Sequence, residues 1–456
     1  MNSQIFREYD IRGVVGKDLD DDGVALIARA IGTYWVHKGV KRVCLGMDAR
    51  LSSPGFSNIM AHGFTQCGLD VIDLGMVPTP VMYFSLFKLD VGGGIEITGS
   101  HNPKDDNGFK IALGHSTIYG GEIQKIREIM EAGIFANGSG RVKPYDISQE
   151  YMDDIIHRID IKPKHLKVVI DPGNGVAGPF AMPIFKALGI DTSGICMEPD
   201  GNFPNHHPDP TISSGIQMLR DEVLGAHADL GIGFDGDADR IGVIDSRGKV
   251  IYGDMITCIL AKAVLEKNPG EKILGEVKCS KVLFDEVKKA GGIPIMGKVG
   301  HSLMKARLME EKAALAGEMS GHIFFVNRWY GFDDAIYAAC RLLEILSCVD
   351  NPQTIFDALP VMVNTPEIRF ECKDRIKVQV VERFASWART GYEKIVDIDG
   401  IRFENQDGWG LVRPSNTQPV IVMRFEAKDA GTLEAMQTDT RNRLKMIMDK
   451  IEPPGM

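Results

Sequence analysis

A serine in a turn is the first residue whose setting could support chemistry. Ser100 lies in Thr-Gly-Ser-His-Asn-Pro (residues 98–103), directly after the apolar alternating run of residues 95–97. The run is typical of a buried strand and turn-forming residues follow it, so we expect the hydroxyl at the tip of a loop. His101 and Lys110 could exchange a proton with this hydroxyl or with a hydroxyl of a substrate. Taken alone, the segment is equally compatible with an ordinary polar turn.

Three aspartates follow a second strand-like run. Asp235, Asp237 and Asp239 are spaced by two, and Arg240 comes next. Ionised carboxylates this close repel one another, and a hard dication would relieve the repulsion. Mg²⁺ fits best, because it takes few protein oxygens and keeps positions for water or a phosphate oxygen. Arg240 could bind a phosphate or pair with the cluster.

Two known aspartate motifs do not fit this loop, whereas a solvated acidic turn remains an alternative. An EF-hand would require glycine where Arg240 stands and a glutamate where Ser246 stands. Phosphatases of the haloacid-dehalogenase type would require Thr or Val where Asp239 stands. The cluster therefore predicts a magnesium site of another kind.

A third polar loop has residue types that bind sugar hydroxyls. Glu318, Ser320 and His322 alternate after the strand expected at residues 313–315. They offer an acceptor, a donor/acceptor and a group that can change its charge. This set suits a pair of sugar hydroxyls, each of which both donates and accepts. A structural loop with a helix cap is the alternative.

A fourth polar loop near the end of the chain has the groups of a phosphate clamp. Arg413 is followed, after a proline, by Ser415, Asn416 and Thr417. A guanidinium, two hydroxyls, an amide and nearby backbone N–H groups can hold a phosphate. Ser-Asn-Thr is also a common turn, so this segment is informative only beside the other three loops.

The bulk composition limits the partners. A chain of 456 residues exceeds a single core and should form three or four domains. Its net charge of −10 argues against nucleic acid and anionic membranes as partners. An anionic substrate would therefore need positive groups concentrated locally, and Lys278 and His301, in two loops of the third block of the chain, are candidates.

The cysteines and the N-terminus favour a cytoplasmic protein. No two of the eight cysteines are closer than eight residues, so there is no Cys-x-x-Cys motif, and we expect reduced, mostly buried thiols. The first residues lack the basic and apolar regions of a signal peptide. No apolar run reaches the roughly 18 residues that a membrane span needs.

Strand-like and helix-like runs alternate through most of the chain, which predicts the α/β class. We expect three related α/β domains around a central cleft, at residues 1–147, 148–250 and 251–362, each ending a strand in one of the first three polar loops. Ligands bind at that carboxyl edge of open α/β sheets. Residues 363–456 should form a smaller α+β domain that contributes the fourth loop, with residues 368–371 and 376–381 in its β-rich start.

The four loop motifs, in this order and in four successive blocks, resemble those of the α-D-phosphohexomutase superfamily. They read Thr-Gly-Ser-His-Asn-Pro, Asp-Gly-Asp-Ala-Asp-Arg, Gly-Glu-Met-Ser-Gly-His and Arg-Pro-Ser-Asn-Thr. The resemblance is greatest to the bacterial phosphomannomutase/phosphoglucomutase group, and it covers essentially the whole chain. It includes the Phe-Arg-Glu-Tyr-Asp-Ile-Arg-Gly opening and the Gly-Phe-Asp-Asp stretch at residues 331–334.

The resemblance implies a role for each candidate residue. Ser100 would be the phosphoserine, and its phosphate would hold Mg²⁺ together with Asp235, Asp237 and Asp239. His101 and Lys110 would be candidates for proton transfer. The residues implied to bind the substrate are Glu318 and Ser320 at the sugar hydroxyls, His322 supporting their loop, Arg413, Ser415, Asn416 and Thr417 at the non-reacting phosphate, and Tyr9, Arg12, Arg240, Lys278 and His301 along the cleft.

The implied reaction interconverts hexose 1-phosphate and hexose 6-phosphate, with mannose, glucose or both as the sugar. Hexose 1,6-bisphosphate would be the intermediate and activator, and Mg²⁺ the cofactor. The partners would be small sugar phosphates, and the protein a monomer or weak oligomer. A phosphoglucosamine mutase and a metal-dependent sugar-phosphate phosphatase are alternatives, and a non-catalytic sugar-phosphate sensor disagrees with the intact serine and aspartates.

Overall fold

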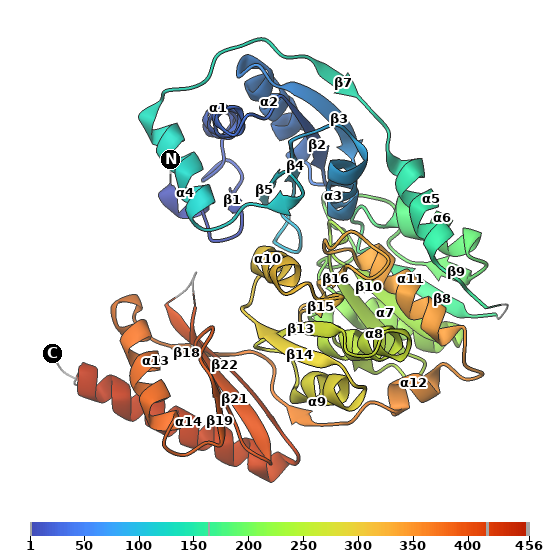
Figure 1. Ribbon diagram of the computed structural model, residues 1–456, viewed down its shortest axis with the longest axis vertical. Helices are drawn as coiled ribbons and strands as arrows, with labels where there is room; N and C mark the ends of the chain where they lie inside the picture. Colours follow the sequence, from blue (N-terminus) through green and yellow to red (C-terminus); the bar gives the residue numbers. More distant parts are fainter. Residues whose placement is uncertain (1, 163–164, 416–418, 453–456) are drawn as a thin grey trace.

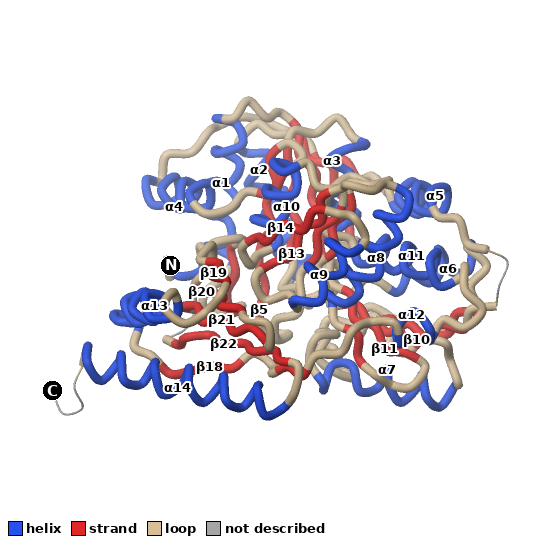
Figure 2. The backbone as a smooth tube through the Cα atoms, turned by 60° about the horizontal axis from the view of Figure 1, so that its bottom comes forward, coloured by secondary structure: helices blue, strands red, loops and turns tan. Residues whose placement is uncertain are grey.

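The computed structural model describes residues 2–162, 165–415 and 419–452. Its strands form four sheets, each built from one stretch of the chain, and helices flank them (Figures 1 and 2). In Figure 1 the four bodies follow one another from the blue domain I at the top, through the green and yellow domains II and III, to the red domain IV. Among the described residues, no helix has the length and apolar character needed to cross a bilayer.

Domain I contains a seven-stranded sheet of order β1-β5-β4-β2-β3-β7, with β6 paired to β5. Strand β2 is parallel to β3 and β4, whereas β5 is antiparallel to β4. The carboxyl ends of β2 and β4 therefore lie at one edge of the sheet. The elements are η1 Ser3–Ile5, β1 Ile11–Val14, α1 Asp21–His37, β2 Arg42–Met47, α2 Ser53–Gln66, β3 Asp70–Met76, α3 Thr79–Lys88, β4 Gly93–Ile97, β5 Asp106–Leu113, β6 Ser116–Thr117, α4 Gly121–Ala132 and β7 Val142–Pro144.

Domain II has a five-stranded sheet of order β12-β11-β10-β8-β9, in which β8, β9 and β10 are parallel. Its strands are β8 Lys167–Asp171, β9 Asp191–Gly194, β10 Leu230–Phe234, β11 Ile241–Asp245 and β12 Val250–Ile251, and its helices are α5 Ser148–Arg158, α6 Gly178–Ala187 and α7 Ser213–Ala226. Strand β12 straddles the boundary expected after residue 250; the domain limits themselves stay a prediction.

Domain III has a four-stranded sheet of order β14-β13-β15-β16, with β13, β14 and β15 parallel. Its strands are β13 Lys272–Glu276, β14 Ile293–Gly297, β15 Leu315–Gly317 and β16 Ile323–Phe325, and its helices are α8 Gly253–Lys267, α9 Lys281–Lys289, α10 His301–Glu311, α11 Ala335–Leu346 and α12 Gln353–Asp357. Domains II and III share one continuous apolar core, which also takes in residues of α3 from domain I.

Domain IV has an antiparallel sheet of order β17-β22-β21-β20-β19, with β18 paired to β22. Helices α13 and α14 pack on one face around a separate core, and Trp409 and Leu411 pack from β21 against Val277 of domain III. The elements are β17 Val363–Asn364, β18 Ile368–Glu371, α13 Asp374–Ala388, β19 Lys394–Val396, β20 Ile401–Glu404, β21 Gly408–Pro414, β22 Val420–Ala427 and α14 Ala430–Ile451.

The fold class is as predicted, but one local prediction is wrong. Residues 376–381 do not belong to a β-rich start; they lie within α13. Ile376, Val378 and Val380 alternate as in a strand, yet Val378 is 53% exposed, and the buried side chains recur at Ile376, Val380 and Phe384. That spacing marks one face of a helix packed on a sheet.

Candidate active site

The serine loop is held in a strained conformation at the carboxyl end of β4. Ser100 has a φ of 49°, which is uncommon for a residue other than glycine. Its backbone N–H donates to Thr98 Oγ1 over 2.7 Å. Its hydroxyl donates to Asp235 Oδ2 over 2.8 Å and lies 3.1 Å from His101 Nδ1. Strained residues of this kind cluster at functional sites.

The fully buried guanidinium of Arg50 organises this loop. It donates to the carbonyl oxygens of Ser100, Asn102, Pro103 and Asp106, and to the carboxylate of Asp48. The carbonyl groups of the serine loop are thus occupied by Arg50. The Ser100 hydroxyl instead points to the aspartates. No sequence motif indicates a role for Arg50, although Asp48-Ala49-Arg50 directly follows the end of β2.

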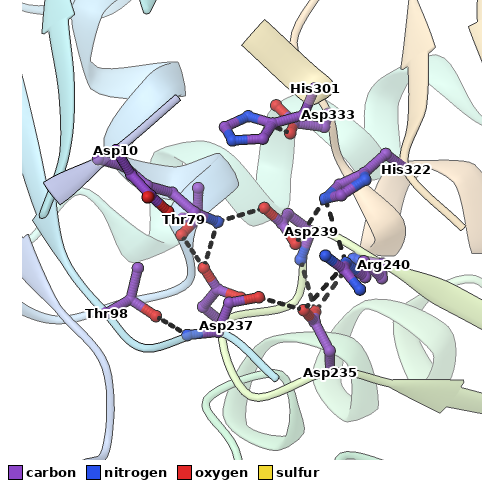
Figure 3. A network of polar contacts seen from close by, with 12 residues as sticks. Asp10, Thr79, Thr98, Asp235, Asp237, Asp239, Arg240, His301, His322 and Asp333 are labelled. Carbon is purple, nitrogen blue, oxygen red and sulfur yellow. Dashed lines mark hydrogen bonds and ion pairs between the residues drawn. The ribbon is translucent and has the colours of Figure 1, made fainter. Parts of the chain in front are cut away.

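The aspartate loop lies directly beside the serine loop (Figure 3). One carboxylate oxygen from each of Asp235, Asp237 and Asp239 lies within 4.8 Å of the others, and all three residues are buried. A Cβ atom at Gly236 would lie 2.7 Å from the carbonyl oxygen of Ser100, so only glycine permits this approach. The predicted proximity of the serine and the three carboxylates is therefore present.

This arrangement fits a hard dication. Oδ1 of Asp237 is buried and accepts no hydrogen bond from the described residues, and Oδ1 of Asp239 has among them only a long contact, 3.4 Å, with His322 Nε2. Burial, together with Asp239 and Asp237, raises the pKa of Asp235 well above its usual value. Charged oxygens without donors in a dry site are costly, and Mg²⁺ would satisfy them. Thr79, which belongs to none of the four loop motifs, donates to Asp237 Oδ2 over 2.6 Å.

The two candidates for proton transfer lie in different surroundings. Lys110 donates to Asp237 Oδ2 over 2.6 Å and to Asp239. Burial alone would lower the pKa of Lys110, but these carboxylates raise it, so that the side chain stays an ammonium. Burial and the neighbouring Arg240 and Arg12 instead lower the pKa of His101 well below its usual value, which keeps the imidazole neutral.

His322 connects the sugar-binding loop to the aspartates. Its Nδ1 lies 2.7 Å from Glu318 Oε2, and its Nε2 lies 3.4 Å from Asp239 Oδ1. Burial would lower the pKa of His322, but Asp239 and Glu318 raise it to about 9, so the imidazolium donates from both nitrogens. Arg240 Nε, 3.3 Å from Nε2, is then a neighbouring positive charge rather than a donor. Ser320 Oγ donates to Glu318 Oε2 over 3.2 Å.

A cavity of about 1000 Å³ opens onto this centre. Its walls include residues from all four domains, and eight predicted site residues are among them. These eight are Tyr9, Arg12, Ser100, His101, Lys110, Arg240, His301 and His322. Domain IV contributes Asp374 and Lys377. The predicted convergence of domain loops on one cleft is therefore observed, with a net surplus of basic side chains among those eight.

Besides the three aspartates, five other predicted residues lie behind or beside the cavity wall rather than on it. Arg413 pairs with Asp399 over 3.1 Å, and Asp399 also accepts from the backbone N–H of Val299 over 3.1 Å. Tyr9 donates to the carbonyl of Val299 over 2.8 Å, so this chain of contacts joins domains I, III and IV. The carbonyl of Ser415 accepts from the cavity-lining Lys377.

The other three are Glu318, Ser320, which bonds to Glu318, and Lys278. Glu318 accepts from the backbone N–H of Gly300 over 2.9 Å. Lys278 Nζ lies 3.8 Å from Glu367 Oε2. Asn416 and Thr417 lie outside the described residues.

Comparisons with known proteins agree with this architecture. Models of the phosphoglucomutase/phosphomannomutase family match all four parts of the chain: the alpha/beta/alpha domains I, II and III at residues 3–137, 149–248 and 252–360, and the C-terminal domain at residues 367–443. The crystal structure of a phosphoglucomutase/phosphomannomutase family protein from Burkholderia thailandensis superposes with a TM-score of 0.93 at 43% identity, covering 100% of this chain and 99% of the other.

Two curated relatives are similar over nearly their full length. A phosphoglucomutase from Neisseria gonorrhoeae is 44% identical over 449 residues, covering 98% of this chain and 96% of its own. A phosphomannomutase/phosphoglucomutase from Pseudomonas aeruginosa is 44% identical over 453 residues, covering 99% and 98%.

The four-domain fold is that of an α-D-phosphohexomutase. Within that superfamily the chain belongs to the phosphoglucomutase/phosphomannomutase family, whose enzymes are isomerases that interconvert sugar 1- and 6-phosphates.

Proposed function

We propose that the enzyme converts hexose 1-phosphates into hexose 6-phosphates by way of phosphorylated Ser100 and a bound hexose 1,6-bisphosphate. The observation that carries this proposal is the Ser100 hydroxyl, 2.8 Å from Asp235 Oδ2 and on the wall of a cavity large enough for a sugar bisphosphate. The bond from phosphorus to Ser100 Oγ breaks as a bond to the free sugar hydroxyl forms. After the bisphosphate turns end for end, the other phosphoryl group returns to Ser100.

Asp235, Asp237 and Asp239 would hold Mg²⁺ together with the Ser100 phosphate. The ion would neutralise negative charge on the phosphoryl group, which suits a reaction that depends on positioning and electrostatics. The ammonium of Lys110, between Asp237 and Asp239, adds a second positive charge at the same place. Arg240 and Arg12, on the cavity wall, add two more. These groups offset the unfavourable net charge of −10.

Each phosphoryl transfer also moves one proton. The attacking sugar hydroxyl loses its proton when Ser100 gives up the phosphoryl group, and Ser100 loses its own when it takes one back. His101 is the better candidate for the step at Ser100, because its Nδ1 lies 3.1 Å from Oγ and the ring is neutral. Lys110 is bonded to carboxylates and stays protonated, so we assign it to orientation and charge.

A mass measurement tests the phosphoserine directly. After incubation with glucose 1,6-bisphosphate, the intact protein should carry one phosphate, and that phosphate should map to the peptide containing Ser100. A phosphate found only on another peptide would overturn the assignment. A phosphatase, the second candidate, would release inorganic phosphate instead of the isomeric sugar phosphate, so phosphate release should be assayed in the same samples.

Arg413→Ala should raise KM by roughly 10- to 150-fold, the equivalent of about 1.5–3 kcal/mol for a hydrogen bond to a charged group. We propose that the Arg413 fork binds the non-reacting phosphate, which can be attached to either end of the sugar. Steady-state kinetics on glucose 1-phosphate would measure the change. Arg383→Ala, on the exposed side of α13, is the matched control and should keep its KM. An unchanged KM in Arg413→Ala would remove this residue from the clamp.

Mannose 1-phosphate and glucose 1-phosphate should have specificity constants within about tenfold, a difference of about 1.4 kcal/mol. The two sugars differ only at C2. We propose that Glu318 and Ser320 hold O3 and O4, which both sugars place alike. When the bisphosphate turns end for end, O3 and O4 roughly exchange their positions in the site, and C2 comes to face a different wall. A site that selected the configuration at C2 would therefore need a tight pocket on both walls.

Glucosamine 1-phosphate should be the poorer substrate, because its amino group is a larger change at C2. The measurement is a side-by-side comparison of kcat/KM for the three 1-phosphates. A preference for glucosamine 1-phosphate would favour the phosphoglucosamine mutase alternative, and the argument from O3 and O4 would be abandoned.

A further inference from the structure

A second group of metal-binding side chains lies in domain II, separate from the three aspartates. One ligand atom from each of Asp171, Cys196 and His206 lies within 4.8 Å of the others. Asp171 ends β8, and Cys196 follows β9, the neighbouring strand at the right of Figure 1. His206 comes from the long connection that precedes α7. No step proposed above uses any of the three.

The histidine is oriented as metal-binding histidines are. His206 Nδ1 faces the backbone carbonyl of His207 at 2.9 Å, and this contact fixes a proton on Nδ1. Nε2 is thereby directed at the group, 2.9 Å from Asp171 Oδ2. In metal sites the nitrogen that does not bind the ion usually makes this kind of bond to a carbonyl. Asp171 is buried, whereas Cys196 and His206 are partly exposed, so an ion has a path to the group.

We propose that Asp171, Cys196 and His206 form a zinc site. One thiolate, one imidazole and one carboxylate are a donor set that Zn²⁺ accepts and Mg²⁺ does not favour. Bond lengths near 2.0–2.3 Å would place the donors of a tetrahedral ion roughly 3.3–3.7 Å apart, so a pair at the 4.8 Å limit would have to approach by about 1 Å at most. On binding, the thiol of Cys196 and the bond between His206 Nε2 and Asp171 Oδ2 each release one proton to solvent, and a water completes the fourth position.

The site would stabilise the junction between domains I and II. The connection that carries Cys196 and His206 also carries Phe203, whose ring lies 5.3 Å from the Arg50 guanidinium carbon. Gly201 lies so close that a Cβ there would be 2.8 Å from Cα of Arg50. Arg50 in turn bonds the carbonyl of Ser100. Zinc would therefore stabilise the segment that covers Arg50. None of its three ligands takes part in the proposed reaction.

Co²⁺ is the probe that tests this site, because a cobalt–thiolate bond produces a charge-transfer absorption that oxygen ligands do not. The full-length protein, with Mg²⁺ in excess to occupy the aspartates, should develop this band with saturation at one equivalent of Co²⁺. Zn²⁺ should displace it. Cys196→Ser should lose the band, whereas Cys348→Ser, at the exposed cysteine, should keep it.

Two further measurements show whether loss of the cobalt band in Cys196→Ser reflects the lost ligand rather than misfolding of the variant. His206→Gln retains the thiol and should weaken Co²⁺ binding by at least about tenfold. Zn²⁺ should raise the melting temperature of the wild type and of Cys348→Ser but not that of Cys196→Ser. The proposal is overturned if the wild type shows no thiolate band, or if the band persists in Cys196→Ser.

Discussion

Ser100→Ala is expected to reduce mutase turnover by at least about a thousandfold, because loss of a covalent nucleophile leaves only binding and electrostatics. The hydroxyl is the group of the serine loop that meets the aspartates, through its 2.8 Å bond to Asp235. Alanine tolerates the φ of 49° no worse than serine does, so the loop should keep its shape. Asp235 retains the backbone N–H groups of Asp239 and Arg240 as donors.

A coupled assay for glucose 6-phosphate and an intact-mass measurement would test this prediction together. The variant should show neither turnover nor a gain of phosphate from glucose 1,6-bisphosphate, while its circular dichroism spectrum stays that of the wild type. Ser116→Ala, at an exposed serine of the same domain, is the control and should behave as the wild type in both. Turnover of Ser100→Ala within about tenfold of the wild type would refute the phosphoserine.

Removal of divalent cations should lower activity by at least about a hundredfold, and Mg²⁺ should restore it. The physical reason is the buried trio, in which Oδ1 of Asp237 accepts no hydrogen bond from any described residue and Oδ1 of Asp239 has among them only the 3.4 Å contact with His322 Nε2. Asp237→Asn should show a loss of similar size even with Mg²⁺, because one ligand charge is gone. It also removes like-charge repulsion, which offsets its weaker pairing with Lys110, so the fold should persist.

The measurement is turnover after chelation and after back-titration with Mg²⁺, with melting temperatures recorded in parallel. Asp285→Asn, an exposed carboxylate that pairs with Lys281 on α9, is the matched control and should change neither quantity appreciably. Full activity of the chelated enzyme would exclude an essential metal. Unfolding of Asp237→Asn would indicate instead that this carboxylate is needed mainly for its bonds to Thr79 and Lys110.

The amino-acid sequence by itself determined the fold class, the order of the polar loops and the expectation that Ser100 and the three aspartates lie together. The reason is that a buried strand followed by turn formers has few alternatives, and parallel strands bring their carboxyl ends to a common edge. Ser100 and Asp235, which are 135 residues apart, could therefore be expected to meet. The prediction of a β-rich start at residues 376–381 was wrong, because these residues lie in α13. Apolar alternation over a few residues does not distinguish a strand from one buried face of a helix.

Only the tertiary structure decided which partners each polar side chain has. Arg50 is distant in the sequence from the serine loop, and its role follows from its burial against four carbonyl groups. The difference between the neutral His101 and the protonated Lys110 depends on charges contributed by another domain. The pairing of Arg413 with Asp399 also depends on the three-dimensional structure, through the register of β20 with β21 and the contact of Asp399 with Val299 of domain III. Hydrogen bonds, burial and charge are properties of three-dimensional neighbours, which residue type and spacing do not specify.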